Sequence, residues 1–373
     1  MRENEADFSK VPGVVINHSP ARSERYIGSP SIAMHPGGRY VASNDYFGPG
    51  GDRGRYNSSV IFSSSDRGET WEKLASLEGQ FWSTLFTHRG TLYLIGTSGK
   101  DGDITIRRST DGGRGWTVPE GEDSGILARG RYHCAPVPVV VHRDRVWRAM
   151  EDRNKEGQRP FMMSAPVDSD LLRSSSWTFS GKLESAPHQD HRMRSWREGN
   201  AVVKPDGGMA IVMRIGLKDG HSTAALIDVS DDGRHLRFDP ADGYVEFPGG
   251  TGKKFTIRLD PETERYWSVV NPIQPRDLVH LEPTKAGAFR NCLAVSSSED
   301  LRRWQVLEII AYHPEFRNHA FQYPDWIFDG DDIAAVSRTA YDDGLGGAAN
   351  RHDANFMTFH RIRDFRRLVN EAG

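Results

Sequence analysis

The sequence lacks several features that would place it at once in a large class of proteins. Its formal net charge is only -3 over 373 residues, so no strong field draws the protein to nucleic acid or to a membrane surface. No run approaches the roughly 20 consecutive apolar residues that cross a bilayer. Residues 1–7 have no apolar core and do not read as a signal peptide. The protein is therefore expected in the cytoplasm, or outside it after a signal has been removed.

Cysteines and amphipathic helical runs are also scarce. The two cysteines, Cys134 and Cys292, lie in apolar, strand-like runs and are predicted to be buried free thiols, so no disulfide framework indicates the compartment. No segment reads convincingly as a long amphipathic helix, whereas the chain holds 38 glycines and 10% aromatic residues. This composition favours an all-β protein with many tight turns.

The chain does contain a repeated turn motif. Residues 64–71 and 109–116 both read Ser-x-Asp-x-Gly-x-x-Trp. The aspartate accepts hydrogen bonds from nearby backbone N–H groups, the glycine takes a conformation that other residues resist, and the tryptophan covers the hydrophobic seam. Weaker copies are Asp231-x-Gly233-x-x-Leu236 and Ser297-x-Glu299 followed by Trp304. Copies at long, irregular intervals predict a repeat architecture.

Six further hairpin turns are flanked by apolar or alternating runs. They lie at residues 35–38, 88–90, 142–144, 205–208, 260–263 and 329–332, and outer hairpins close near Trp71, Trp116, Trp177, Leu236, Trp304 and Phe365. A spacing of roughly 45 to 70 residues is typical of four-stranded propeller blades. The sequence therefore predicts a six-bladed β-propeller of four-stranded antiparallel blades, forming one domain over residues 1–373. Residues 11–17 would add an outer strand to the last blade and close the ring.

This architecture predicts the position of the functional site. In each blade the first strand leaves one face and the second returns to it, so the six turns and the aspartate motifs lie on the opposite face. Residues just before each first strand and just after each second strand converge on the central axis. Arginines, aromatic residues and carboxylates occupy these positions. They suit an acidic sugar, because arginine binds a carboxylate bidentately and aromatic rings stack on a pyranose.

The candidate residues form two groups, and each residue has a structural alternative. The candidate catalytic residues are Asp45, His133, Glu151, Glu198 and Tyr323. The candidate substrate-binding residues are Arg25, Asn44, Tyr46, Trp82, Arg148, Trp196, Arg214, Phe255, Arg290, Gln322 and Arg338. As alternatives, an arginine beside a strand end is a salt-bridge partner, His133 is a core histidine, and Trp82 or Phe255 packs between blades.

No metal site and no cofactor are predicted. His319, Asp325, His352 and Asp353 carry ligating groups, but their spacing matches no metal-binding signature. His352 and Asp353 look like a general base with its orienting carboxylate, yet neighbours on a strand point to opposite faces, so no direct pair is expected. The expected partner is an acidic oligosaccharide or glycoconjugate rather than nucleic acid, and the oligomeric state stays open.

Through its two strict motifs, the chain resembles the sialidase-type propellers with Asp-box (BNR) repeats over nearly its whole length. The resemblance implies an arginine triad on a sialate carboxylate, a Tyr–Glu pair as nucleophile and activator, and an Asp as acid/base. By position, Tyr323 and Glu198 would form the pair, and Arg148, Arg214, Arg290 and Arg338 would form the clamp. The Arg-Ile-Pro motif of that family corresponds to residues 26–31, Tyr-Ile-Gly-Ser-Pro-Ser, so no arginine stands in the motif position.

Four segments are also similar to a divergent group of sialidase-like propellers from polysaccharide-degrading bacteria. They are residues 196–200, 254–258, 323–332 and 352–361. That group includes relatives of rhamnosidases and of lyases that remove rhamnose from glucuronate. Many members carry His where this chain has Asn44. Because Asn does not titrate near neutral pH, a catalytic role of that His would be lost or moved here.

Three functions remain in competition. The leading one is an exo-acting glycoside hydrolase that cleaves a terminal residue of a uronate- or sialate-bearing glycan, drawing its acid and its base or nucleophile from Asp45, Glu151, Glu198 and Tyr323. A polysaccharide lyase would instead neutralise a uronate carboxylate and remove the C5 proton with His133, Tyr46 or Tyr323. The third is a non-catalytic glycan-binding propeller, which Asn44 favours.

Overall fold

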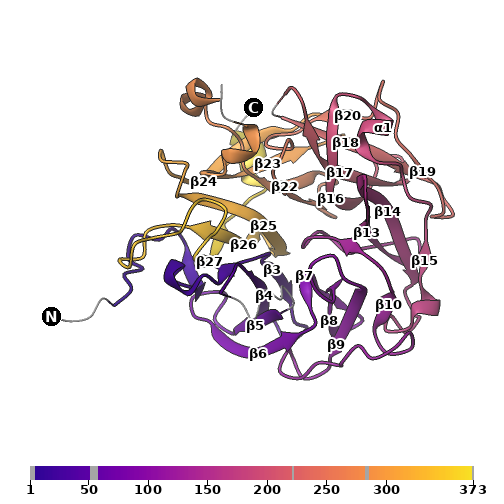
Figure 1. The fold of residues 1–373 in the computed structure, drawn as a ribbon, viewed down its shortest axis with the longest axis horizontal. Coiled ribbons are helices and arrows are strands. Elements are labelled where there is room, and N and C mark those ends of the chain that lie inside the picture. The colour runs from indigo at the N-terminus through magenta and orange to yellow at the C-terminus, as the bar shows by residue number, and fades with distance from the viewer. Residues whose placement is uncertain (1–4, 51–57, 221, 282–284, 372–373) are drawn as a thin grey trace.

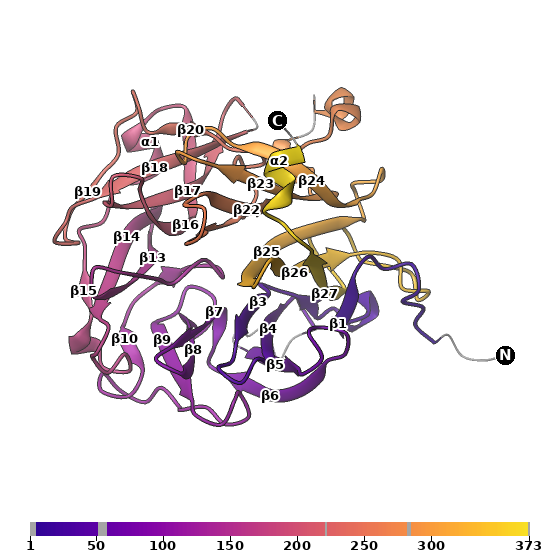
Figure 2. The same cartoon turned by 180° about the vertical axis from the view of Figure 1, so that it is seen from behind.

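The protein is a ring of six antiparallel sheets around a central axis (Figure 1). The computed structural model describes residues 5–50, 58–220, 222–281 and 285–371. Residues 1–4, part of the segment on which the signal-peptide expectation rests, lie outside them. Figure 2 shows the same ring from behind, with the first and last blades side by side. The prediction of an all-β, six-bladed propeller is confirmed.

Each blade is a four- or five-stranded sheet with its inner strand beside the axis. Blade 1 contains β2 (Tyr26–Ile27), β3 (Ser31–Met34), β4 (Tyr40–Phe47), β5 (Ser58–Ser64) and β6 (Glu72–Glu78). Blade 2 contains β7 (Phe81–His88), β8 (Thr91–Thr97), β9 (Ile104–Ser109) and β10 (Ile126–Ala128). Blade 3 contains β11 (Tyr132–His133), β12 (Val140–His142), β13 (Arg145–Asn154), β14 (Gly157–Pro166) and β15 (Thr178–Phe179).

The second half of the ring repeats this plan. Blade 4 contains β16 (Met193–Val203), β17 (Met209–Leu217), β18 (Thr223–Val229), β19 (Leu236–Arg237) and β20 (Tyr244–Glu246). Blade 5 contains β21 (Thr256–Leu259), β22 (Tyr266–Val270), β23 (Cys292–Ser298) and β24 (Gln305–Tyr312). Blade 6 contains β25 (Ala320–Asp329), β26 (Asp332–Ala340) and β27 (Phe356–Ile362), and its outer strand is β1 (Val14–His18), which pairs antiparallel with β27.

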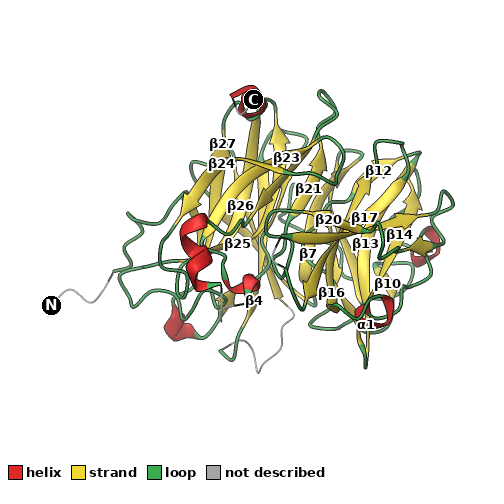
Figure 3. Cartoon of the chain, turned by 90° about the horizontal axis from the view of Figure 1, so that it is seen from above, coloured by secondary structure: helices red, strands yellow, loops and turns green. Residues whose placement is uncertain are grey.

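All six predicted inner turns join the inner strand of a blade to the next strand. In blades 1 and 3 that inner strand is interrupted, so β2 and β3 both pair with β4, and β11 and β12 both pair with β13. The helices are short and lie in the connections around the strands (Figure 3). They are η1 (Ala21–Ser23), η3 (Ser174–Ser176), α1 (Ala186–Gln189), η4 (Pro275–His280), η5 (Ala286–Ala288) and α2 (Arg367–Glu371). Among the described residues, no helix has the length and apolar character to cross a membrane.

The aspartate turns are built as their residues require. Asp111 accepts hydrogen bonds from the backbone N–H groups of Arg114 (3.1 Å) and Gly115 (2.9 Å) and from Ser109 Oγ (2.9 Å), while Trp116 Nε1 donates back to Gly113 O (2.9 Å). Residues 64–71 repeat this pattern, with Trp71 Nε1 donating to Gly68 O at 3.1 Å. These bonds satisfy the backbone groups that a tight turn leaves unpaired.

The weaker copies use different residues from those expected. In the third turn the acceptor is Asp232, which binds Ser230 Oγ (2.5 Å) and Arg234 N (3.0 Å), whereas Asp231 points outward with 86% of its side chain exposed. In the fourth turn Ser298 and Asp300 take the places expected for Ser297 and Glu299. Both predictions were one residue out of register, because adjacent serines and acidic residues offer two alignments.

Large apolar side chains fill the space between neighbouring blades. Trp147 and Trp196 are buried together between blades 3 and 4, and Trp267 and Trp326 are buried together between blades 5 and 6. Cys134 and Cys292 are buried and unpaired, as predicted.

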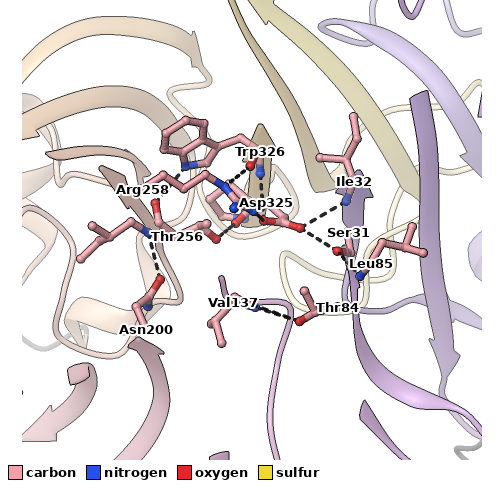
Figure 4. Close-up of polar contacts among 12 residues, drawn as sticks. Ser31, Ile32, Thr84, Leu85, Val137, Asn200, Thr256, Arg258, Asp325 and Trp326 are labelled. Atoms are coloured by element: carbon pink, nitrogen blue, oxygen red, sulfur yellow. Dashed lines mark hydrogen bonds and ion pairs between the residues drawn. The ribbon is translucent and has the colours of Figure 1, made fainter. Parts of the chain in front are cut away.

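A belt of polar side chains joins the inner strands around the axis (Figure 4). Asp325 on β25 accepts hydrogen bonds from Ser31 Oγ (2.6 Å) and Ile32 N (3.2 Å) of blade 1. Equivalent bonds run from Leu85 N to Ser31 Oγ, from Val137 N to Thr84 Oγ1, from Ile257 N to Asn200 Oδ1 and from Thr256 Oγ1 to Pro324 O. Inner strands have an edge without a backbone partner, and this belt pairs part of it.

Candidate functional site

A cavity of about 450 Å³ opens on the face opposite the six inner turns. Its walls come from the inner strands, from the loops that precede them and from the ends of second strands. The residues that line the cavity include Gly28, Ser29, Asp45, Phe47, Phe81, Trp82, His133, Glu198, Tyr323, Arg338, His352 and Asp353.

Irregular inner strands aim three side chains into this cavity. The pairing register shifts between Phe81 and Thr84 in β7, between Trp196 and Gly199 in β16, and between Gln322 and Asp325 in β25. Such bulges redirect the side chains that they carry. Trp82 and Tyr323 also have left-handed backbones, with φ of 49° and 54°. A regular strand would not present Trp82, Glu198 and Tyr323 in this way.

Tyr323 lies against Glu198 and three guanidinium groups. Its hydroxyl is 3.4 Å from Glu198 Oε1 and 3.3 Å from Arg214 Nη1, and Arg214 Nη1 donates to Glu198 Oε2 at 2.8 Å. The guanidinium carbons of Arg338, Arg290 and Arg214 lie 4.3, 5.8 and 6.0 Å from the centre of the Tyr323 ring. Positive charge therefore surrounds one phenol and one carboxylate.

Glu198 is ionised although it is buried. Burial opposes its ionisation, but the charges of Arg214, His133 and Arg197 outweigh that penalty and lower the pKa of Glu198 to about 2. Behind the cavity, the Gln322 side-chain oxygen accepts hydrogen bonds from both Arg290 and Arg338, the latter at 2.9 Å. Gln322 thus holds two arginines side by side without neutralising either of them.

Asp45 occupies a tight carboxyl pocket in the wall of the cavity. Its Oδ1 accepts a hydrogen bond from Ser29 N (2.6 Å) and its Oδ2 one from Trp82 N (2.7 Å). Burial outweighs these bonds and raises the pKa of Asp45 to about 6. A Cβ atom at Gly28 would lie 1.4 Å from Asp45 Oδ1, so this pocket requires glycine at residue 28.

His133 and Glu151 form a second ionisable pair. His133 Nδ1 lies 3.0 Å from Glu151 Oε2, and Glu151 Oε1 accepts a hydrogen bond from Gly199 N at 3.0 Å. Burial raises the pKa of Glu151, and the hydrogen bond with His133 opposes this shift. The imidazole lines the cavity and meets the Trp82 ring edge-on at 4.5 Å.

Several of the predicted substrate-binding residues do not line the cavity. The Arg148 guanidinium is fully buried and donates to the carbonyl groups of Ala135 (2.8 Å) and Ala149 (3.1 Å) within blade 3. Arg25 stacks on the Tyr46 ring at 4.5 Å. Trp196 and Phe255 are buried in blade packing, and Asn44 Nδ2 donates to Asp45 O at 2.9 Å. Of the arginines, Arg338 lines the cavity, and Arg214 and Arg290 lie behind Tyr323.

His352 and Asp353 differ from the expectation. They lie in a bend before β27, which begins at Phe356, and His352 Nδ1 is 2.8 Å from Asp353 Oδ1. The argument against a direct pair assumed a strand at these residues and was wrong for that reason. Phe47 lines the cavity at the end of β4, where the strand-end rule places it. Lys100 was missed, although it follows β8, the second strand of blade 2, and the same rule would have found it.

Comparisons with known proteins identify the fold. No family model and no curated protein matches the sequence. A protein of unknown function from Dyadobacter fermentans superposes with a TM-score of 0.61 at 14% identity, over 95% of this chain and 98% of that chain. A Hadza microbial sialidase superposes with a TM-score of 0.61 at 13% identity, over 94% of this chain and 68% of that chain. An α-L-arabinofuranosidase from Fusarium graminearum, in complex with an iminosugar inhibitor, superposes with a TM-score of 0.60 at 12% identity, over 94% and 97%. These similarities show a shared propeller fold.

Proposed function

We propose that the protein is an exo-acting glycoside hydrolase that removes a terminal residue from an acidic, uronate- or sialate-bearing glycan. The observation that carries this proposal is the contact of Tyr323 with Glu198 inside a group of three arginines. The similarity in fold to a sialidase and to an arabinofuranosidase supports glycosidase chemistry. The cavity volume of about 450 Å³ suits the end of a glycan chain.

In this proposal the ionisable residues of the site have separate roles. Arg338, which lines the cavity, binds the substrate carboxylate, and Arg290 and Arg214 add positive charge from behind Tyr323. Asp45 donates its proton to the glycosidic oxygen as that bond breaks. The Tyr323 oxygen attacks the anomeric carbon while its proton passes to Glu198. Water then attacks the glycosyl–tyrosine intermediate, Asp45 takes the proton of the water, and Tyr323 regains its own from Glu198.

A screen against acidic plant, algal and host glycans tests this function. We expect release of one terminal sugar with a new reducing end, and a loss of kcat of roughly 100-fold or more in Tyr323→Phe. Tyr93→Phe, on β8 and outside the cavity, is the matched control and keeps wild-type turnover. Methyl esterification of the substrate carboxylate slows cleavage about 10- to 100-fold, because it removes charge-assisted hydrogen bonds. An ester cleaved as fast as the acid overturns the acidic-glycan assignment.

A lyase is the second candidate, and the His133–Glu151 pair favours it. His133 Nε2 would remove the proton from C5 of a uronate, and the leaving oxygen would depart with a proton from Tyr323 or Asp45. The product would then be unsaturated and absorb strongly in the ultraviolet, and His133→Asn would abolish its formation while His191→Asn, with an exposed side chain, would not. Glycan binding without either product would indicate a non-catalytic propeller.

A further inference from the structure

A cluster of histidines and carboxylates stands apart from the cavity, where blade 5 passes into blade 6. His313 follows β24, His319 precedes β25, and Asp342 follows β26. Ligating atoms of His313, Glu315 and His319 lie within 4.8 Å of one another. We propose that His313, His319 and Asp342 bind a divalent transition-metal ion of the Zn²⁺ type, with Glu315 as the carboxylate that orients His319.

His319 has the arrangement that metal-binding histidines commonly show. Its Nδ1 lies 2.8 Å from Glu315 Oε2, so the carboxylate holds the proton on Nδ1 and leaves the lone pair on Nε2. The residue is 7% exposed, and its Nε2 is buried without a hydrogen-bond partner among the described residues. A buried, unpaired imidazole nitrogen is costly, and a metal ion would satisfy it.

The other two ligands lie next to that nitrogen. Asp342 Oδ2 is 3.6 Å from His319 Nε2, slightly more than the separation of about 3.3 Å between two ligands of one tetrahedral Zn²⁺. The His313 ring stacks on the His319 ring with centroids 3.6 Å apart and planes 17° apart, so one ring would turn when both Nε2 lone pairs bind the same ion. His313 Nδ1 is 3.1 Å from both Glu315 O and Glu315 N. In the tautomer whose Nδ1–H donates to Glu315 O, the Nε2 lone pair is available to an ion.

The charge of the cluster and its surroundings also favour a divalent metal ion. A metal ion binds the neutral imidazole through the lone pair of a ring nitrogen. The Glu315 and Asp342 carboxylates then give the cluster a surplus of negative charge that a divalent cation neutralises. Two imidazoles and a carboxylate are a usual ligand set for zinc. The Tyr341 ring meets both imidazoles edge-on, at 5.5 Å from His313 and 4.9 Å from His319.

The position of the cluster gives the ion a structural task. It would tie residues 313–319, which lead into β25, to Asp342 at the exit of β26. These strands carry Tyr323 and Arg338, so the ion would anchor the cavity end of the blade that supplies these two groups. The sequence predicted no metal site, because the ligands come from two separate loops and form no spacing signature.

Calorimetric titration of chelator-treated, full-length protein with ZnCl₂ tests the proposal. We expect one ion per chain at this cluster and a melting temperature that rises with Zn²⁺ concentration. His319→Gln weakens binding about 100-fold, and Glu315→Gln about 10- to 100-fold, because Glu315 orients His319. Asp342→Asn, at a side chain that is 70% exposed, gives a variant whose folding is not at risk and weakens binding at least about 10-fold.

A second group of ligating residues provides the matched control. Glu156, Glu184 and His188 also lie within 4.8 Å of one another, but all three are exposed and none holds a buried, unpaired nitrogen. His188→Gln therefore leaves the affinity unchanged. The proposal is overturned if wild-type protein binds no Zn²⁺, if His319→Gln and Asp342→Asn bind as tightly as wild type, or if His188→Gln abolishes binding. None of these readouts depends on glycosidase activity.

Discussion

At the scale of single residues, two carboxyl groups of the cavity are held in opposite ionisation states. Burial raises the pKa of Asp45 to about 6. Glu198 is equally buried, but the charge of Arg214 prevails and its pKa falls to about 2. Environments that push two carboxyl pKa values apart separate an acid from a base. Near pH 5, Asp45 keeps a proton to donate and Glu198 is free to accept one.

The first prediction concerns the pH dependence of turnover. The Asp45 acid is protonated below about pH 6 and ionised above it, so kcat should fall as the pH rises through about 6. Asp45→Asn should lower kcat about 100- to 10,000-fold and remove this limb of the profile. A pH–rate profile of both proteins checks this, and a limb that persists in Asp45→Asn belongs to another group.

The sequence predicted the positions of the arginines relative to the cavity only in part. Arg214 and Arg338 are the sixth residue of nine in β17 and the seventh of nine in β26, whereas Arg148 is only the fourth of ten in β13. The sequence indicated second strands but not their lengths, so Arg148 was placed too near the cavity end. Its guanidinium instead pairs with carbonyl groups inside blade 3.

At the scale of elements, hairpins were predictable and irregular strands were not. Turns rest on local glycine, proline and aspartate, which stand in the sequence itself. The bulges that aim Trp82, Glu198 and Tyr323 depend on how one inner strand meets its neighbours, and no local pattern announces them. The aspartate turns fall between these cases, since two of four were one residue out of register.

A prediction at this scale concerns the role of the aspartate turns. Asp111→Ala should lower the free energy of unfolding by about 1–3 kcal/mol, because the N–H groups of Arg114 and Gly115 lose their acceptor. Activity per folded molecule should remain, since this turn lies on the face opposite the cavity. Asp231→Ala is the control and should change stability by less than about 1 kcal/mol, as its side chain is 86% exposed and forms an exposed ion pair with Arg143. Urea denaturation and specific activity measure both effects.

At the scale of the whole molecule, the ring is closed by pairing between β1 and β27. Removal of residues 1–18 should lower the melting temperature by roughly 10 °C or more and promote aggregation, because β27 would expose an unpaired edge. Removal of residues 1–6 keeps β1 and should leave the melting temperature nearly unchanged. Circular dichroism and size-exclusion chromatography compare the two, and equal stability would mean that the closure contributes little.

The same closure sets the order in which the cavity is completed during synthesis. Asp45 belongs to the first blade, whereas Tyr323 and Arg338 belong to the last, whose outer strand comes from the start of the chain. An emerging chain therefore keeps β1 without its partner until β27 leaves the ribosome, and the last blade, which carries Tyr323 and Arg338, is incomplete until then. Folding of this ring is a late, long-range event, and contacts of such sequence separation form slowly. The nascent protein would therefore need its unpaired β1 strand protected before the cavity is complete and can bind an anionic substrate.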